Sequence, residues 1–185
     1  TISRTYPESN ESRLMALEEY RDPILKELID MLEAEGPAEL VGHYIYGDVL
    51  MPARNMLPCV SVARQGTNIR GDGTMQDVHV SPIVLAVIYD WTTDLDQSFD
   101  LARGTTGLYK LIEERNADYS VKARTLSYAL RDNQKLADNL YISIRDEGLM
   151  IDYGLGWEKR GDNIFSVEGI LRFNIELTQP KPNLY

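Results

Sequence analysis

Residues 77–91 have the sequence DVHVSPIVLAVIYDW, and this stretch decides the expected fold. The run from Ile83 to Ile88 is apolar at every position. Such a run predicts a strand that is covered on both faces, at the centre of a sheet. Pro82 cannot donate a hydrogen bond to a neighbouring strand, so we expect a bulge or bend beside it.

A glycine-rich stretch joins this strand to a second expected strand, LPCVSVAR, at residues 57–64. The joining residues 65–76 contain three glycines and Asn68, which are residue types that hairpins use for their turns. A phosphate-binding loop would instead lead into a helix and carry a lysine at the Walker spacing. The Arg-Gly-Asp tripeptide at residues 70–72 has no other extracellular feature beside it. We therefore expect a hairpin tip here.

The N-terminal third contains a clear helix signal. Asp22 followed by Pro23 is the pattern of a helix N-cap and first helical residue. Apolar side chains then recur at helical spacing until Gly36 and Pro37, which predicts a helix over residues 23–35. After it, residues 37–56 form a long irregular connection with one small expected strand around its Tyr-Ile-Tyr run.

Two more helices are expected after the central strand. A capping box at residues 94–97 begins an apolar face that runs to about Asn116. Gly104 and Gly107 weaken this helix intrinsically, so we expect them to allow close packing on the sheet. Residues 118–131 again show helical spacing and predict a third helix, or an extension of the second.

The C-terminal part returns to strands. Apolar and polar residues alternate over 140–144 and again over 149–153, with a turn at Gly148 between them. The last strand has the clearest alternation in the chain, with one apolar face made by Leu171, Phe173, Ile175 and Leu177.

Together these elements predict an α+β protein in helix–hairpin–helix–hairpin order. Its sheet, mixed or antiparallel, would have about four to five strands, with two to three helices packed on one face. Residues 1–20 would form an N-terminal arm with a short helix, and residues 21–178 a single domain. Residues 179–185 would leave as an extended C-terminal arm, because two prolines interrupt any ladder there.

Composition limits the classes of function. The chain has 185 residues and a formal net charge of −10, which disfavours a protein that grips nucleic acid through its phosphates. No apolar run approaches the length of a membrane helix and no secretory signal is visible, so we expect a cytosolic protein without membrane contact. Cys59 is the only cysteine and is expected to be a buried thiol.

The residues that could support catalysis or bind metals are sparse. His43, His79 and Cys59 lack the spacing of a zinc site. Residues 94–98 resemble the start of a calcium loop, but Phe99 occupies the position where that loop requires glycine. No serine lies in a nucleophile elbow. We therefore expect no catalytic residues, no cofactor and no metal, and predict that the protein is not an enzyme.

The order of elements resembles the tail-terminator family of long-tailed bacteriophages over residues 20–178. The connection at 37–56 and the helical stretch near Tyr119 are longer than the compact family plan requires. The stretches that carry the resemblance are RDPILKELIDML (21–32), LPCVSVARQG (57–66), VSPIVLAVIYDWT (80–92), ALRDNQKLADNLYIS (129–143), IDYGLGWE (151–158) and VEGILRFNIELT (167–178).

The resemblance implies a structural virion protein without a substrate. Such a protein forms a homohexameric ring that caps the tail tube, stops its polymerisation and provides the surface on which the head docks. Its partners would be copies of itself, the tail tube protein, head–tail connector proteins and, in a contractile tail, the sheath. DNA would pass through an acidic lumen without specific binding. The protein would be located in the neck region of the virion after assembly in the host cytoplasm.

Two alternatives remain open at this point: another head–tail connector or neck protein of the virion, and a small cytosolic enzyme with no recognisable motif. For the ring reading, we expect the hairpin stretch and the polar side of the last strand to contact neighbouring subunits or rings. The candidate interface residues are Gly66, Asn68, Arg70, Asp72, Arg172, Asn174 and Glu176.

Overall fold

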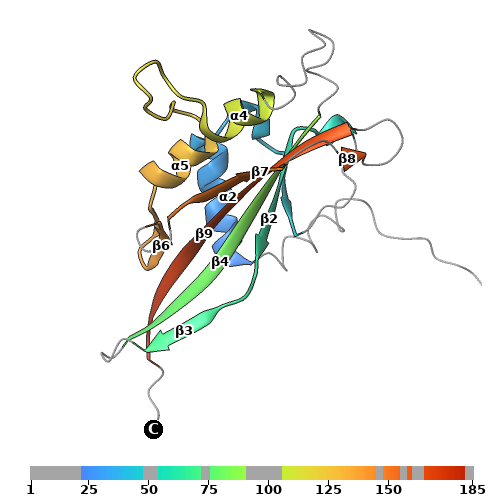
Figure 1. Cartoon of the computed structure of the whole chain (residues 1–185). Coiled ribbons are helices and arrows are strands. Elements are labelled where there is room, and N and C mark those ends of the chain that lie inside the picture. Colours follow the sequence, from blue (N-terminus) through green and yellow to red (C-terminus); the bar gives the residue numbers. More distant parts are fainter. Residues whose placement is uncertain are drawn as a thin grey trace, which may run out of the picture.

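The structure is a computed structural model of the 185-residue chain. It describes residues 22–47, 54–71, 76–90, 106–144, 148–154, 158–159 and 165–181. Within these residues, a nine-stranded sheet carries helices on one face (Figure 1). The arm and short helix expected over residues 1–20 lie outside the described residues.

The helices and strands of the described residues are as follows. The helices are α2 (Pro23–Glu35), η1 (Ala38–Leu40), η2 (Arg54–Met56), α4 (Thr106–Glu113) and α5 (Leu126–Asp132). The strands are β1 (Tyr44–Tyr46), β2 (Cys59–Arg64), β3 (Asn68–Gly71), β4 (Gln76–Asp90), β5 (Lys135–Ala137), β6 (Leu140–Ser143), β7 (Met150–Tyr153), β8 (Glu158–Lys159) and β9 (Phe165–Pro180).

Two long strands form the middle of the sheet. β4 and β9 pair antiparallel along the whole of β4, from Gln76 opposite Pro180 to Asp90 opposite Ser166. β2 and β3 pair with the other edge of β4, and β6, β7 and β8 pair with the other edge of β9. β1 pairs with β2 in parallel, which makes the sheet mixed. The prediction that the 77–91 stretch is a central strand is confirmed.

The expected sheet of four to five strands in helix–hairpin–helix–hairpin order is wrong. Residues 140–144 and 149–153 do not form a hairpin, because β6 and β7 both pair with β9, one after the other. From Ser143 to Met150 the chain advances seven residues, whereas their partners Asn174 and Arg172 are two apart. The extra residues leave the ladder and divide what would be one strand. Interruptions of this kind raise the strand count to nine.

The bulge or bend expected at Pro82 is absent from its own strand, since β4 pairs with β9 without interruption, and the irregularity lies instead between β2 and β3. Four residues separate Arg64 from Asn68, whereas their partners on β4 are three apart. Gly66 lies in this bulge with φ of +131°, a value that favours glycine. The carbonyl of Pro82 accepts a hydrogen bond from the Gln65 amide at 2.9 Å. The side of Pro82 that cannot donate therefore faces an irregular neighbour. The expected hairpin tip contains β3, and residues 72–75 beyond it lie outside the described part.

Helix α2 forms as the sequence predicts. The Asp22 carboxylate accepts a hydrogen bond from the Ile24 amide at 3.0 Å, and Pro23 is the first helical residue. Gly36 ends the helix, as expected. The buried face of α2 consists of Leu25, Leu28, Ile29 and Leu32.

The other two helices are shorter than predicted. The described part of the expected helix up to about Asn116 is α4, which ends at Glu113, and residues 91–105 lie outside the described residues. The expected helix over 118–131 begins only at Leu126, where Thr125 caps α5 by accepting from the Tyr128 amide. Tyr119, inside the predicted span, has a positive φ of 67°, which is incompatible with a right-handed helix.

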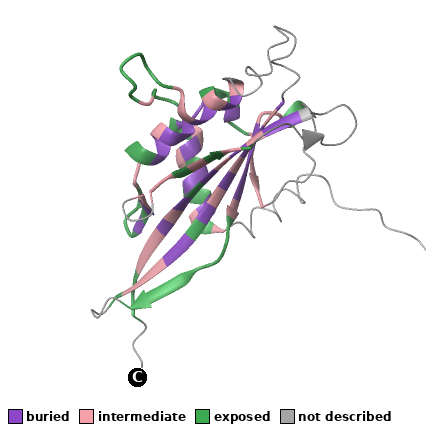
Figure 2. Ribbon diagram, viewed as in Figure 1, coloured by how far each residue is buried: buried purple, intermediate pink, exposed green. Residues whose placement is uncertain are grey.

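The core lies between the helices and one face of the sheet. Cross-strand partners share a face, and every sheet residue of the core cluster belongs to the face that the helices cover (Figure 2). The predicted apolar side of β9 is confirmed, because Leu171, Phe173 and Ile175 are buried in this core. Cys59 is buried and forms no disulfide, as expected. None of the helices in the described part has the length and apolar character needed to cross a bilayer.

Gly107 allows α4 to approach the sheet closely, as the sequence predicts. A methyl group at this position would lie closer than 3.0 Å to three atoms of the Tyr89 side chain. We expect Gly107→Ala to lower the free energy of unfolding by about 1–2 kcal/mol, because overpacking outweighs the better helix propensity of alanine. Urea denaturation measures the change.

Gly71→Ala is the matched control. A methyl group there meets nothing closer than 3.8 Å, so its effect should stay within about 0.5 kcal/mol. Equal stability of the two variants would contradict the close packing of α4 on β4.

Candidate interaction surfaces

The sheet face opposite the helices is the first candidate surface, and we call it the open face. Its members follow from the strand register, because cross-strand partners point to the same side. Helices α2, α4 and α5 lie on the other side (Figure 1). The open face includes Asn68, Arg70, Pro82, Val84, Ala86, Met150, Asp152, Ile170, Arg172, Asn174 and Glu176.

The open face combines an apolar centre with charged neighbours. Met150 is 58% exposed, although it is a large apolar side chain, and it lies opposite Arg172. Arg172 in turn lies opposite half-buried Val84 and forms a long ion pair of 3.9 Å with Asp152. A hollow of about 220 Å³ lies along this part of the sheet, lined by Pro82, Val84, Met150 and Arg172 among others. Exposed apolar area beside charged groups is typical of protein-binding surfaces.

Five of the seven predicted interface residues lie on the open face. Asn68 and Glu176 form one row with Val80, which pairs with both of them. Arg70, Arg172 and Asn174 point to the same side. The strand register thus brings together two groups that are a hundred residues apart in the sequence. Of the other two, Gly66 lies in the bulge and Asp72 lies outside the described residues.

Strand β3 provides an open backbone edge next to this face. All four of its residues are exposed (Figure 2), and β4 is its only partner among the described strands. Ile69, at its centre, is 59% exposed. An exposed edge strand with an apolar side chain can pair with a strand of another chain.

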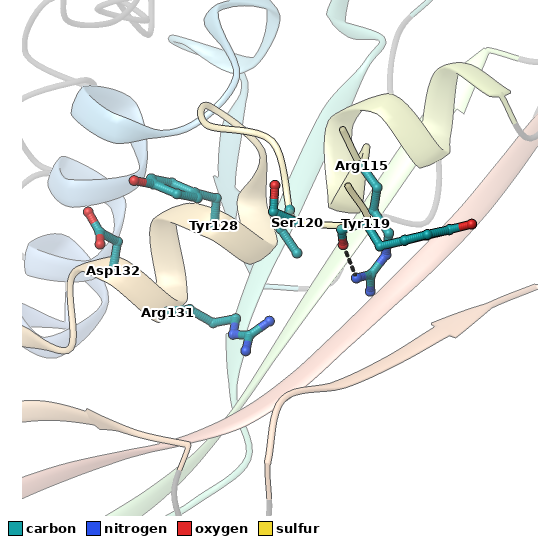
Figure 3. Close-up of a pocket in the computed structure, with 7 residues that line it drawn as sticks. Arg115, Tyr119, Ser120, Tyr128, Arg131 and Asp132 are labelled. Carbon is teal, nitrogen blue, oxygen red and sulfur yellow. Dashed lines mark hydrogen bonds between the residues drawn. The ribbon is translucent and has the colours of Figure 1, made fainter. Parts of the chain in front are cut away.

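A second candidate surface lies around two arginines, Arg115 and Arg131, beside the loop between α4 and α5. Two adjacent cavities of about 560 and 510 Å³ are both lined by Arg115 and Arg131. In Figure 3 both guanidinium groups extend into the space beside the loop that carries Tyr119, whereas Asp132 points away from it. The first cavity is also lined by Tyr119, Ser120 and Tyr128.

Hydrogen bonds fix the loop between α4 and α5. The Asp118 carboxylate accepts from the amide of Ser120 at 3.0 Å and from its hydroxyl at 2.6 Å. These two bonds lower the pKa of Asp118 below its usual value of 3.8. Arg115 donates to the Tyr119 carbonyl at 3.0 Å. These bonds hold the backbone of the loop, on which the Tyr119 side chain is 81% exposed.

Tyr153 and Glu113 hold the Arg115 side chain in place. The Tyr153 hydroxyl donates to Glu113 at 3.0 Å, and the other oxygen of Glu113 pairs with Arg115 at 3.1 Å. Burial, followed by the charge of Glu113, raises the pKa of Tyr153, so its phenol remains a hydrogen-bond donor. The sequence analysis did not identify these residues. Arg115 and Arg131 are sixteen positions apart, and only the packing of α4 against α5 brings them together.

The residues considered for metal binding form no metal-ligand cluster in the described structure. Within the described ranges, no three His, Cys, Asp or Glu side chains converge as metal ligands. His43 lies with its Nδ1 2.8 Å from the Pro58 carbonyl. The calcium-like residues 94–98 lie outside the described part. What the two surfaces offer chemically is binding: apolar area and a free strand edge on one, guanidinium and phenol groups on the other.

The lowered pKa of Asp118 gives a prediction about the loop. The carboxylate has a lower pKa in the folded than in the unfolded chain, so its contribution is complete above about pH 4 and is lost as the pH falls through the lowered pKa. We expect the Ser120 amide resonance to stay constant from pH 7 to about pH 4 and to move only below that. Asp118→Asn should remove this titration, and Asp138→Asn, at a carboxylate whose side chain is 98% exposed, should not. Movement of the Ser120 amide resonance well above pH 4 would contradict the lowered pKa of Asp118.

Comparisons with known proteins identify no family for the chain. A scan against protein-family models finds no match, and a search of curated proteins finds no significantly similar sequence. The function therefore has to be argued from the surfaces themselves.

Proposed function

We propose that the chain is a structural protein that assembles with copies of itself into a ring, and that this ring caps a bacteriophage tail tube. The observations that carry the proposal are the open face with its exposed Met150 and the outer edge of β3, with which no other described strand pairs. The resemblance of several sequence stretches, such as VSPIVLAVIYDWT at residues 80–92, to tail terminators suggests the biological setting.

The two features lie on opposite sides of the β4–β9 pair, since β3 pairs with β4 and β7, which carries Met150, pairs with β9. We propose that each of them contacts a different surface of a neighbouring copy. Contacts between unlike patches are head-to-tail, and identical subunits joined in this way form a closed ring when the rotation closes. Burial of an edge strand between subunits also removes a site at which chains would otherwise aggregate.

The proposed partners follow from this arrangement. The ring would bind the last ring of tail tube protein on one side and a head–tail connector on the other, and a contractile tail would add a contact to the sheath. The net charge of −10 suits a lumen through which DNA passes without adhering. The site of action would be the neck of the virion, after assembly in the host cytoplasm.

The test is the mass of the purified protein by light scattering, followed by negative-stain imaging with and without tail tubes. A six-subunit ring, or a monomer that forms a ring only at tube ends, is the expected result. A monomer that ignores tubes would overturn the proposal. A ring that binds the connector but never the tube would identify a different neck protein.

Substitution of Met150 tests whether the centre of the open face forms the contact between subunits. We expect Met150→Lys to raise the subunit concentration for half assembly about 10-fold or more, because the lysine must lose its hydration in the interface. Its stability should be unchanged, since Met150 is largely exposed. Sedimentation velocity across a dilution series measures the assembly.

Met56→Lys is the matched control. Met56 is the same residue type, 38% exposed, and lies in η2 outside the open face. It should assemble like the wild-type protein. Equal behaviour of the two variants would exclude the centre of the open face from the interface.

A further inference from the structure

The charge of the chain is unevenly distributed. Residues 110–135 carry six cationic and four acidic side chains, a formal charge of +2, within a chain of −10. Residues 22–40 carry six acidic side chains and one lysine, a formal charge of −5. The first segment contains the loop and α5, and the second contains α2 and η1. One molecule therefore carries both members of a complementary electrostatic pair.

Arg131 is a cation for which the described part of the chain supplies no side-chain partner. Its guanidinium forms no hydrogen bond or ion pair with any side chain in the part that the structure describes, although α2 packs against α5. Arg115, beside it, is held in place by Glu113 and by the Tyr119 carbonyl. Figure 3 shows both guanidinium groups at the same hollow. We call Arg115, Arg131 and Tyr119 the arginine site.

The arginine site has the chemistry of a carboxylate-binding surface. A guanidinium matches a carboxylate with two parallel hydrogen bonds. Tyr119 lies in the loop beside the arginines, on backbone of positive φ. The hydrogen bond between Asp118 and Ser120 holds this part of the loop. Tyrosine and arginine are also the side chains most enriched among residues that dominate protein interfaces. A partner with several carboxylates along one face fits this arrangement.

Helix α2 and the turn after it carry exposed carboxylates. Glu27 and Glu35 are exposed on α2, two helical turns apart, and Glu39 is exposed on η1. Among the described side chains, none forms a hydrogen bond or ion pair with Glu35 or Glu39. We call Glu27, Glu35 and Glu39 the acidic strip.

We propose that the arginine site of one subunit binds the acidic strip of a neighbouring copy of the chain. This inference rests on the proposed ring and adds a second, electrostatic contact to the apolar one at the open face. Because the two patches differ, the contact is head-to-tail and repeats around the ring. It should weaken with added salt, since the Debye length falls to about 8 Å at physiological ionic strength.

Charge reversal and charge exchange test the contact. We expect Arg131→Glu to raise the subunit concentration for half assembly about 10-fold or more at low salt. Combining Arg131→Glu in turn with Glu27→Arg, Glu35→Arg or Glu39→Arg should restore assembly in at least one double variant. Lys135→Glu changes the net charge equally but lies outside both cavities, and it should assemble like wild type. Sedimentation velocity at two salt concentrations measures every variant.

The outcomes separate this inference from the proposed function. If the wild-type protein forms no ring with or without tubes, both fail. If the wild type forms rings and Arg131→Glu does so equally well, the arginine site is not an interface, while the ring stands. If Arg131→Glu weakens assembly and no exchange restores it, the acidic strip is not the occupant. If Arg131→Glu forms normal rings that no longer bind tubes, the inference is also overturned, because the arginine site would then bind another protein.

Discussion

The pairing of β4 with β9 is the constraint on which the rest of the structure depends. Their ladder extends over the full length of β4, and both outer parts of the sheet attach to its two free edges. The register also decides which side chains face the helices, because Leu85 lies opposite Leu171 on the covered side and Val84 lies opposite Arg172 on the open side. A shift of one residue would exchange these sides and expose the core. The open face is therefore a consequence of the same register that builds the core.

The parts of the fold that were predicted correctly are those encoded by local periodicity. The N-cap and proline at the start of α2, the apolar run in β4 and the alternation in β9 each specify an element without reference to a partner. The pairing of residues 140–153 is different, because alternation shows that a segment is a strand and not which strand it joins. Two strands that are adjacent in the sequence most simply pair with each other in a tight hairpin. The long partner β9 offered both of them a continuous edge instead.

The candidate surfaces show the same limit. Turn chemistry pointed to β3 and alternation pointed to Arg172 and Glu176, but only the register shows that these residues share one face. The arginine site left no local pattern, because its two arginines come from different elements on either side of a loop. That loop interrupts a span with helical spacing, and the strained backbone at Tyr119 is the reason the spacing misled. Departures from local preference are most frequent at functional positions, so the error itself directs attention to this loop.

The two surfaces would have different effects on an assembly. Apolar area at the open face supplies affinity but little discrimination between orientations. Charged patches discriminate strongly, because a two-fold arrangement that placed the arginine site against itself would bring Arg131 beside its own copy. A head-to-tail arrangement instead places the guanidinium beside carboxylates. The charge of the acidic strip reinforces this choice, because residues 22–40 carry a formal charge of −5 and two copies of this segment would repel each other. The same uneven charge that keeps free subunits apart would thus select the one orientation that closes a ring.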